Sequence, residues 1–520
     1  MKVLTASVLL SICLFLNIAL AQFQDITVPN GSQAGELSLK PCTLGEGEKA
    51  VNAECGTLVV PENRSDPGSK LIALPVAVVR SKSGDSKEPI FNLNGGPGAS
   101  NLVGSPPTWL YETHDVITVG YRGADGSVIL EMPSLEKAMR GKGGDLLAEA
   151  SIQNVANAMN NDFDRLRAQG IDLKGYSMSE VVDDMEAARV ALGYDRINLL
   201  SASYGTRLAQ YYATRYPHNL YRSLMIAVNP PGRMVWEPDM LDSQLEQLAE
   251  LCAEHPVCSS KTSNLAETIR TVSQNMPKRW LFLPIDPGKV KLAAFVMMSV
   301  TPPEFAAAVY DTFIAAENGD ASGLAAITLA FTLPPFNLTK SSLWGDLLTK
   351  GMTDFDPRRD YLKDMNPAAS ALGSPHSLLF FGAAQLEPPQ LAVLPDDLKE
   401  PQSSDIETLL VSGSIDLSTP ARYATEELLP SLSNGEQVIL ENYGHLDFYD
   451  PLEAFERLVL SFFDEGIVDT SLYPNKPFRF QPALNFPLIG KLIATASGGG
   501  LLMILILLFL VFKRLRRRST

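Results

Sequence analysis

Histidine and cysteine are scarce in this sequence, since each occurs only five times in 520 residues. The chain also lacks the C-x-x-C and H-E-x-x-H patterns that place zinc ligands close together. These absences argue against a metal site. We therefore expect neither a bound metal nor a cofactor.

Basic residues are outnumbered as well, with 43 Lys and Arg against 59 Asp and Glu. Six of the basic residues lie at the two ends of the chain, so residues 22–512 carry a net charge of −22. Nucleic-acid binding needs the opposite sign and is excluded as a function. Such a charge favours solubility outside the cell.

Both ends of the chain are apolar. Residues 1–21 combine a positive charge at Lys2, an apolar run and the sequence ALA at 19–21, which is typical of a secretory signal peptide. Residues 492–512 form 21 uncharged, mostly apolar positions, enough to span a bilayer as one helix. The basic run KRLRRR (513–518) predicts that this end stays in the cytoplasm. We expect export, with a single C-terminal transmembrane helix.

Four cysteines remain once the signal peptide is removed, and they fall into two local pairs. Of the three possible connectivities, Cys42–Cys55 with Cys252–Cys258 is the simplest. Structural disulfides agree with export. A bridge that closes a loop of about 14 residues stabilises the fold by about 3 kcal/mol in the chain-entropy model.

Short runs rich in β-branched residues alternate with helical patterns along much of the chain. This alternation predicts an α/β fold with a mostly parallel sheet and helices on both faces. The expected strands are 56–61, 71–80, 89–93, 115–120, 196–200, 223–228 and 407–413, and the expected helices are 179–194, opened by Ser179 as N-cap, 206–217 and 450–463.

The alternation lapses between about Pro230 and Pro401, where helix-like and Pro-rich stretches replace it. A mainly helical cap inserted into one α/β domain explains this pattern. The predicted division is 22–230 for the first part of the core, 231–400 for the cap insertion, 401–465 for the second part of the core, 466–491 for a tether, 492–512 for the transmembrane helix and 513–520 for a basic cytoplasmic tail.

Ser203 lies at the point where a predicted strand turns into a predicted helix, in the sequence SASYG (201–205). The nucleophile elbow of hydrolases has the pattern G-x-S-x-G because the strained turn admits only small neighbours. Gly205 supplies the second glycine, and Ser201 replaces the first. A plain helix N-cap is the alternative interpretation of Ser203.

A serine nucleophile needs a histidine to take its proton and an acid to orient that histidine. Among the five histidines His445 is the best candidate, because Asp416 follows a strand 29 residues earlier. The chain order Ser203, Asp416, His445 is that of α/β-hydrolases. Asp447 is a weaker candidate acid.

Acyl transfer also needs N–H donors for the developing oxyanion. The glycine-rich sequence NGGPGAS (94–100) follows an early predicted strand. Its N–H at Gly96, or alternatively at Gly95, and the N–H of Tyr204 are the expected donors.

Several segments together resemble the serine peptidase family of proline iminopeptidases and secreted tripeptidyl aminopeptidases. They are CGTLVVPENR, NGGPGAS, DVITVGYRGADGS, SASYGTRLAQYYATRYP, LLVSGSIDLSTP and YGH, and the resemblance covers residues 55–130, 176–230 and 400–465. It implies an α/β-hydrolase fold, a cap over the active site and release of residues from peptide N-termini. By motif position it implies Ser203 as nucleophile, Asp416 as acid, His445 as base, and Gly96 and Tyr204 as oxyanion donors.

The chain departs from this family at named positions. Asn94 stands where the family has a histidine, and it can still hold the turn. The usual Asp-Gln-Arg-Gly reads GYRG (120–123), in which Arg122 remains to structure the nearby loop. In the family, acids of the cap bind the α-amine of the substrate, and Glu237 is the candidate here.

The C-terminal end resembles the Gly-Gly sorting signals of Gram-negative bacteria, which a rhomboid-type protease cuts. The matching features are SGGG (497–500), the apolar span and the basic cluster. A permanent membrane anchor is the alternative. The sequons at Asn30, Asn63 and Asn337 matter only on a eukaryotic secretory route.

These features predict an exported serine hydrolase that cleaves peptides near their N-termini through an acyl-enzyme. A carboxylesterase or lipase with the same triad is the first alternative, because substrate choice depends on the cap. A non-catalytic surface binding protein on a hydrolase fold is the second. The expected partners are a peptide or acyl ester, the membrane and the sorting protease.

Overall fold

The computed structural model describes residues 26–496, except for 85, 103–104, 142–143, 301–302, 334–338, 340–341 and 483. The predicted signal peptide lies outside the described residues. So does the predicted transmembrane span, apart from its first five positions. Within the described ranges, no helix combines the length and the apolar character that crossing a bilayer requires.

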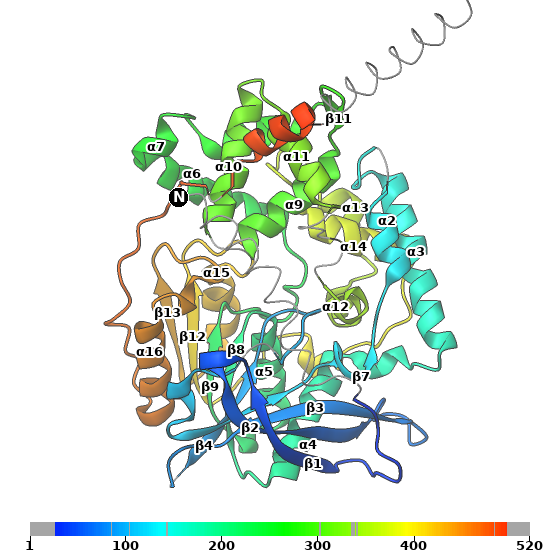
Figure 1. Ribbon diagram of the computed structural model, residues 1–520, viewed down its shortest axis with the longest axis vertical. Coiled ribbons are helices and arrows are strands. Elements are labelled where there is room, and N and C mark those ends of the chain that lie inside the picture. Colours follow the sequence, from blue (N-terminus) through cyan, green and yellow to red (C-terminus); the bar gives the residue numbers. More distant parts are fainter. Residues whose placement is uncertain are drawn as a thin grey trace, which may run out of the picture.

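A sheet of nine strands forms the centre of the core, in the order β1-β2-β3-β5-β4-β8-β9-β12-β13 (Figure 1). The strands from β5 to β13 are parallel neighbours, and the pairs β1-β2, β2-β3 and β3-β5 are antiparallel. The strand bounds are β1 Leu37–Leu44, β2 Val51–Pro61, β3 Leu71–Val79, β4 Lys87–Leu93, β5 His114–Val119, β8 Ile197–Ala202, β9 Leu220–Ile226, β12 Glu407–Gly413 and β13 Gly435–Leu440. Each strand predicted from the sequence overlaps one of these.

Helices cover both faces of the sheet. Val76 and Val78 of β3 belong to one buried cluster, and the alternating Ala77 and Val79 belong to another, so the two clusters lie on opposite faces. Helices α4 (Met178–Leu192) and α5 (Tyr204–Arg215) pack into the first cluster, and α16 (Leu452–Glu465) packs into the second. The predicted α/β fold class, a mostly parallel sheet between helices, is confirmed.

Helix α4 corresponds to the helix predicted for 179–194, with a different start. Its N-cap is Ser177, whose hydroxyl accepts a hydrogen bond from the N–H of Glu180 at 3.4 Å. Ser179, the predicted cap, lies inside the first turn. The helix ends at Gly193 in the left-handed conformation, which glycine adopts at low cost.

Residues 231–400 are mostly helical and lie beyond the carboxyl ends of the parallel strands (Figure 1). Their helices are α6 Pro238–Glu254, α7 Pro256–Ser259, α8 Leu265–Gln274, α9 Pro287–Ser299, α10 Pro303–Glu317, α11 Ser322–Ala330, α12 Trp344–Gly351, α13 Tyr361–Asp364 and α14 Pro375–Leu386, with a short hairpin of β10 Arg279–Trp280 and β11 Leu283–Pro284. We call residues 231–400 the insertion.

Two more helices join this layer from an earlier part of the chain. They are α2 (Pro133–Met139) and α3 (Glu149–Ala168), which follow the short strands β6 (Arg122–Gly123) and β7 (Asp125–Ile129). Helix α3 packs against α14 of the insertion (Figure 1). The helical layer is therefore built from two separate stretches of sequence, and only the second was predicted.

Both predicted disulfides are present. Cys42 and Cys55 link the antiparallel strands β1 and β2, and Cys252 and Cys258 link α6 to α7. The predicted pairing of the four cysteines is confirmed.

The segment after α16 runs from the core onto the insertion. Phe478 and Phe480 are buried there, with Phe480 against the rings of Tyr310 and His255. Further along, the hydroxyl of Ser322 in α11 donates to the carbonyl of Pro487 at 3.0 Å. Much of the sequence predicted to be a tether is thus packed against the helical layer.

Candidate active site

Ser203 occupies a strained turn between β8 and α5. Its φ of 52° and ψ of −122° are unusual for a residue with a side chain, and such strain recurs at functional sites. Its N–H donates to the carbonyl of Ile226 at 2.8 Å, which ties the turn to β9. Ser203 stands at the N-cap position of α5, but its hydroxyl makes no capping hydrogen bond to that helix.

Small neighbours make this turn possible. A Cβ on Gly205 would lie 2.2 Å from the carbonyl oxygen of Leu93, so only glycine fits there. Ser201, in place of the usual first glycine, is buried and donates its hydroxyl to the carbonyl of Leu224 at 3.1 Å. The departure from the elbow pattern is therefore accommodated.

The structure brings Ser203, His445 and Asp416 together from three separate loops. The Oγ of Ser203 lies 2.9 Å from Nε2 of His445, and Nδ1 of His445 lies 2.8 Å from Oδ2 and 3.1 Å from Oδ1 of Asp416. Asp416 follows β12, and His445 follows β13. With Nδ1 donating to the carboxylate, Nε2 is free to accept the serine proton.

Asp416 is fully buried and held by several donors. The N–H groups of Ser418 and Thr419 donate to Oδ1 at 2.8 and 2.9 Å, and the Thr419 hydroxyl donates to Oδ2 at 2.7 Å. Burial by itself would raise the pKa of Asp416, but the charge and hydrogen bond of His445 and the hydrogen bonds of Thr419 hold it below its ordinary value. The carboxylate therefore stays ionised at neutral pH.

The alternative candidates for the acid and the base have partners of their own. The carboxylate of Asp447 accepts the N–H of Gly444 at 2.8 Å and pairs with Lys476 at 3.0 Å, and so it stabilises the histidine loop. His114, at the start of β5, forms a hydrogen bond of 2.9 Å with Asp464 of α16. His376 lies among aromatic rings of the insertion, where burial lowers its pKa to about 4.

The glycine-rich turn 94–99 approaches the nucleophile, and we call it the glycine turn. A Cβ on Gly95 would lie 3.1 Å from Cβ of Ser203. Gly96, with φ of 140° and a cis bond to Pro97, is exposed. The N–H of Tyr204 is the first of α5 and has no partner within the helix. Of the expected oxyanion donors, Tyr204 directly follows Ser203, and the alternative donor Gly95 is the glycine that lies against it.

Asn94 closes the glycine turn with its side chain. Its Nδ2 donates to the carbonyl of Asn101 at 2.8 Å, while its N–H donates to Oδ1 of Asn101 at 2.8 Å. Asn101, a buried residue that sequence reasoning missed, also bonds the carbonyl of Val119 at 2.8 Å. Asn94 holds the turn in the way expected from the sequence.

Arg122 supports the glycine turn less directly than the sequence predicted. Its guanidinium is buried against Asp184, at 2.7 and 2.6 Å, and donates to the carbonyl of Glu62 at 2.6 Å. It joins α4 to the end of β2. The loop nearest the glycine turn is held instead by Asp125, which accepts the N–H groups of Asn101 at 3.0 Å and Tyr121 at 2.8 Å. Sequence reasoning missed Asp125, which lies three residues after Arg122.

Glu237, the candidate for binding a substrate amine, has a partner in the structure. Its two carboxylate oxygens each accept a hydrogen bond from Arg359, both at 2.7 Å. This bidentate pair neutralises the carboxylate. The neighbouring Trp236 links the insertion to the acid loop, because its Nε1 donates to the carbonyl of Ser418 at 2.8 Å.

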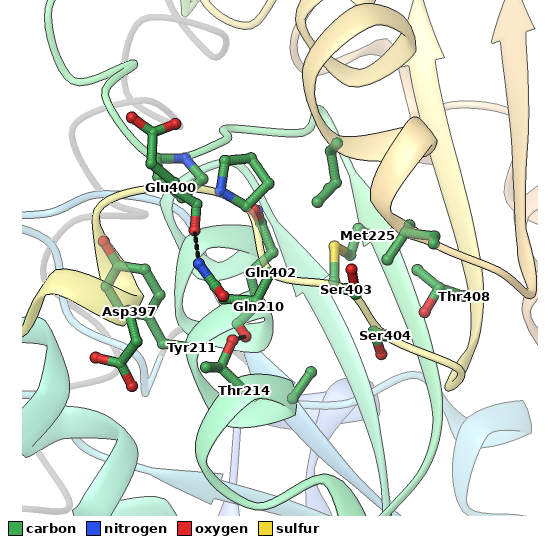
Figure 2. A pocket seen from close by; sticks show the side chains of 15 residues that line it. Gln210, Tyr211, Thr214, Met225, Asp397, Glu400, Gln402, Ser403, Ser404 and Thr408 are labelled. Atoms are coloured by element: carbon green, nitrogen blue, oxygen red, sulfur yellow. Dashed lines mark hydrogen bonds between the residues drawn. The ribbon is translucent and has the colours of Figure 1, made fainter.

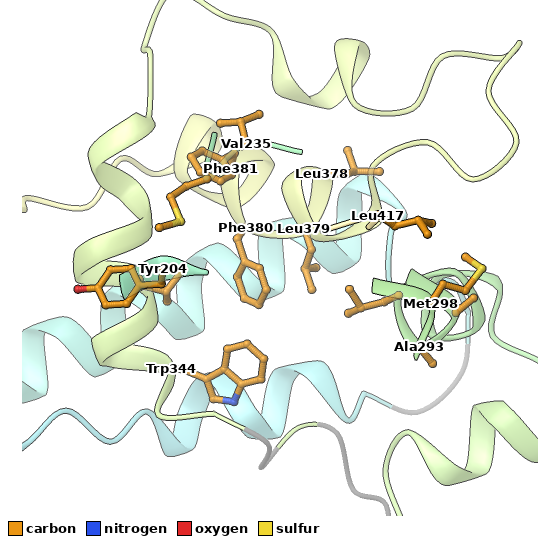
Figure 3. Close-up of a cluster of buried hydrophobic side chains, with 14 of the residues drawn as sticks. Tyr204, Val235, Ala293, Met298, Trp344, Leu378, Leu379, Phe380, Phe381 and Leu417 are labelled. Atoms are coloured by element: carbon orange, nitrogen blue, oxygen red, sulfur yellow. The ribbon is translucent and has the colours of Figure 1, made fainter. Parts of the chain in front are cut away.

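The side chain of Tyr204 reaches an apolar cluster of the insertion (Figure 3). Trp344 and Phe380 of this cluster stack with ring centroids 5.3 Å apart. The residue after the nucleophile therefore belongs to the same buried cluster as side chains of the insertion.

A separate small pocket lies between α5, β9 and residues 397–404 (Figure 2). Gln210, Tyr211 and Gln402 are among its lining residues. None of the predicted site residues is among the described residues that line it. The triad and this pocket are distinct features.

The sheet order, the flanking helices and the loop positions of the triad define the α/β-hydrolase fold. No protein-family profile matches the chain. Serine protease Hip1 of Mycobacterium tuberculosis is 27% identical over 226 residues, which cover 40% of this chain and 41% of the relative. Tripeptidyl aminopeptidase of Streptomyces lividans is 26% identical over 210 residues, which cover 37% of this chain and 38% of the relative. The chain spans about two fifths of the length of these relatives.

Solved structures of hydrolases also align with the chain. Proline iminopeptidase of Mycobacterium smegmatis aligns with 82% of this chain and 97% of its own, at 14% identity and a TM-score of 0.34. An esterase of Exiguobacterium antarcticum aligns with 78% of this chain and 98% of its own, at 12% identity and a TM-score of 0.35.

Proposed function

We propose that this chain is an exported serine peptidase that releases residues or short peptides from peptide N-termini through an acyl-enzyme. The observation that carries the proposal is the continuous contact from Ser203 through His445 to Asp416, at 2.9 and 2.8 Å. Similarity to a serine protease and to a tripeptidyl aminopeptidase favours peptides as substrates.

Each group of the site has a defined role in the proposed reaction. Oγ of Ser203 attacks the substrate carbonyl while Nε2 of His445 takes the serine proton, and Asp416 stabilises the imidazolium that forms. The N–H groups of Gly96 and Tyr204 bind the oxyanion of the tetrahedral intermediate. His445 then protonates the leaving amine. Water hydrolyses the acyl-enzyme by the same proton transfers in reverse, which restores Ser203.

A carboxylesterase with the same triad is the alternative proposal. Its support is the pairing of Glu237 with Arg359, because this pair leaves the candidate amine-binding acid already neutralised. A non-catalytic binding protein has less support, since the strained serine and the three-residue contact serve no purpose in simple binding.

Substrates that differ only at the N-terminus distinguish peptidase from esterase. We expect tripeptidyl and aminoacyl arylamides with a free amine to show kcat/KM at least about tenfold above their N-acetylated forms. The peptidase proposal requires a group that pairs with the charged amine, and such an ion pair is worth about one decade or more. The Ser203→Ala chain, assayed in parallel, supplies the background rate. Turnover of p-nitrophenyl esters without turnover of either arylamide set would select the esterase.

We further propose that the span 492–512 holds the exported chain at the cell envelope until a sorting protease cuts it. A chain that ends at residue 496 keeps the described C-terminal residues and loses most of the span. We expect this shortened chain in the soluble exported fraction with unchanged specific activity, and the full chain in the membrane fraction or at the surface. Cell fractionation measures both. A full chain found in the cytoplasm would contradict the proposal.

A further inference from the structure

The glycine turn is hydrogen-bonded to the insertion as well as to the core. Gly98 is its contact point, because both polar groups of this residue's backbone bond to the region of α12. The N–H of Gly98 donates to Oδ2 of Asp346 at 2.9 Å, and the carbonyl of Gly98 accepts the N–H of Leu343 at 2.8 Å. Gly96, the expected oxyanion donor, is two residues away. Figure 1 shows α12 between the sheet and the helices α13 and α14.

Asp346 is itself held in place by Lys350, one helical turn further along α12. The two side chains form a fully buried ion pair. Nζ of Lys350 also donates to the carbonyl of Arg122 at 3.0 Å and lies 5.6 Å from the ring centre of Tyr121. These contacts leave the carboxylate of Asp346 little freedom to move.

Tyr121 extends the connection to the start of the glycine turn and to Tyr204. Its hydroxyl donates to the carbonyl of Asn94 at 3.0 Å, at the start of the glycine turn. Its ring meets the ring of Tyr204 edge to face, with centroids 5.8 Å apart. The buried pair on α12 therefore contacts the glycine turn at Gly98 and, through Tyr121, at Asn94. Through the same tyrosine it also reaches Tyr204 of α5.

The close approach of α12 requires glycine at two positions. A Cβ on Gly98, whose φ is 84°, would lie 3.0 Å from Cβ of Leu347. A Cβ on Gly123, whose φ is 87°, would lie 2.7 Å from Oδ1 of Asp346. Any side chain at either position would push α12 away from the glycine turn.

A buried ion pair is a poor way to gain stability, because removing two charges from water offsets their attraction. Burial raises the pKa of Asp346 and lowers the pKa of Lys350, so desolvation opposes the charge on both groups. Two apolar residues of the same size would serve the packing as well. What they could not do is accept the buried N–H of Gly98.

We propose that Asp346, held by Lys350, is a positioning residue for the glycine turn, so that the geometry around Gly96 depends on α12 of the insertion. This inference rests on the proposed function. Asp346 acts through the backbone of Gly98 and touches no substrate. Its removal lowers the rate at which a bound substrate reacts and leaves substrate binding almost unchanged.

The test compares two variants matched in shape and charge. Asp346→Asn with Lys350→Met keeps an acceptor for the N–H of Gly98, whereas Asp346→Leu with Lys350→Met has none. With p-nitrophenyl acetate as substrate, we expect kcat per fluorophosphonate-titrated serine to be about 10- to 100-fold lower in the Leu variant than in the Asn variant. KM should agree within about twofold. Equal kcat in the two variants would overturn the proposal.

Lys289→Met is the matched control. Lys289 is another buried lysine of the insertion, paired with Asp286 at 3.7 Å and donating to the carbonyl of Gly141 at 2.7 Å. Its removal should destabilise the fold, as followed by thermal unfolding, while kcat per titrated serine stays at the wild-type value. A loss of kcat equal to that of the Leu variant would assign the effect to general destabilisation and overturn the proposal.

A second variant decides the case if the Leu variant does not fold. Gly98→Ala leaves Asp346 in place and forces the glycine turn away from Leu347. We expect at least a tenfold loss of kcat with KM unchanged, and wild-type kcat would overturn the proposal. Failure of the proposed function would give a different result, because the wild-type chain would then neither hydrolyse the ester nor react with fluorophosphonate.

Discussion

Replacing Ser203 with alanine is expected to lower kcat by about 10⁶-fold on any substrate that the wild-type chain turns over. The reason is that Oγ of Ser203 is the atom that attacks, and His445 at 2.9 Å has no other proton to accept from the substrate side. The residual rate above water comes from binding and from the oxyanion donors. Fluorophosphonate labelling should disappear together with turnover.

Ser223→Ala is the matched control for this prediction. Ser223 lies in β9, the strand next to β8, and its buried hydroxyl has no hydrogen-bond partner among the described residues. Removing that hydroxyl should leave both kcat and labelling unchanged. If Ser203→Ala kept more than about a thousandth of the wild-type kcat, another residue would have to be the nucleophile.

Replacing Asp416 with asparagine is expected to lower kcat by about 10⁴-fold with little change in KM. The N–H groups of Ser418 and Thr419 hold the amide oxygen at the Oδ1 position, so the NH2 group faces Nδ1 and donates to it. His445 then adopts the other tautomer and presents a proton to Ser203. The hydrogen bonds from Ser418 and Thr419 hold an asparagine in the same place, so the fold should survive. Steady-state kinetics and circular dichroism test the two parts of this prediction.

Asp447→Asn distinguishes the two aspartates near His445. Asp447 bonds Gly444 and Lys476, and an asparagine can still accept the N–H of Gly444. We expect kcat to fall by less than about tenfold. A larger loss for Asp447→Asn than for Asp416→Asn would move the role of the acid to Asp447.

Local patterns in the sequence were enough to predict the sheet and the position of Ser203. A buried parallel strand needs a continuous apolar run, and the elbow needs small residues at neighbouring positions, so both leave a signal within a few residues. The same holds for the two disulfides, whose cysteines are 13 and 6 residues apart. The helix α3 also carries such a signal, because Ile152, Met159 and Phe163 are buried at helical spacing. That signal was missed.

The supporting residues of the site were harder to predict. Asn101 and Asp125 are ordinary polar residues in loops, and nothing around them in the sequence marks them as buried. Arg122 was predicted to structure the loop near the glycine turn, and instead it bonds Asp184 in α4. In each case the partner lies on a different element, so its identity depends on how the elements pack.

The sequence by itself determined the class of fold, the disulfide pairs and the three residues of the candidate triad, because strand, turn and motif patterns are local and the order of the triad follows the order of the strands. Only the tertiary structure decided how the insertion meets the core. The bond between Gly98 and Asp346 spans 248 residues of chain. Contacts of that separation depend on the packing of whole elements, and no local pattern encodes them.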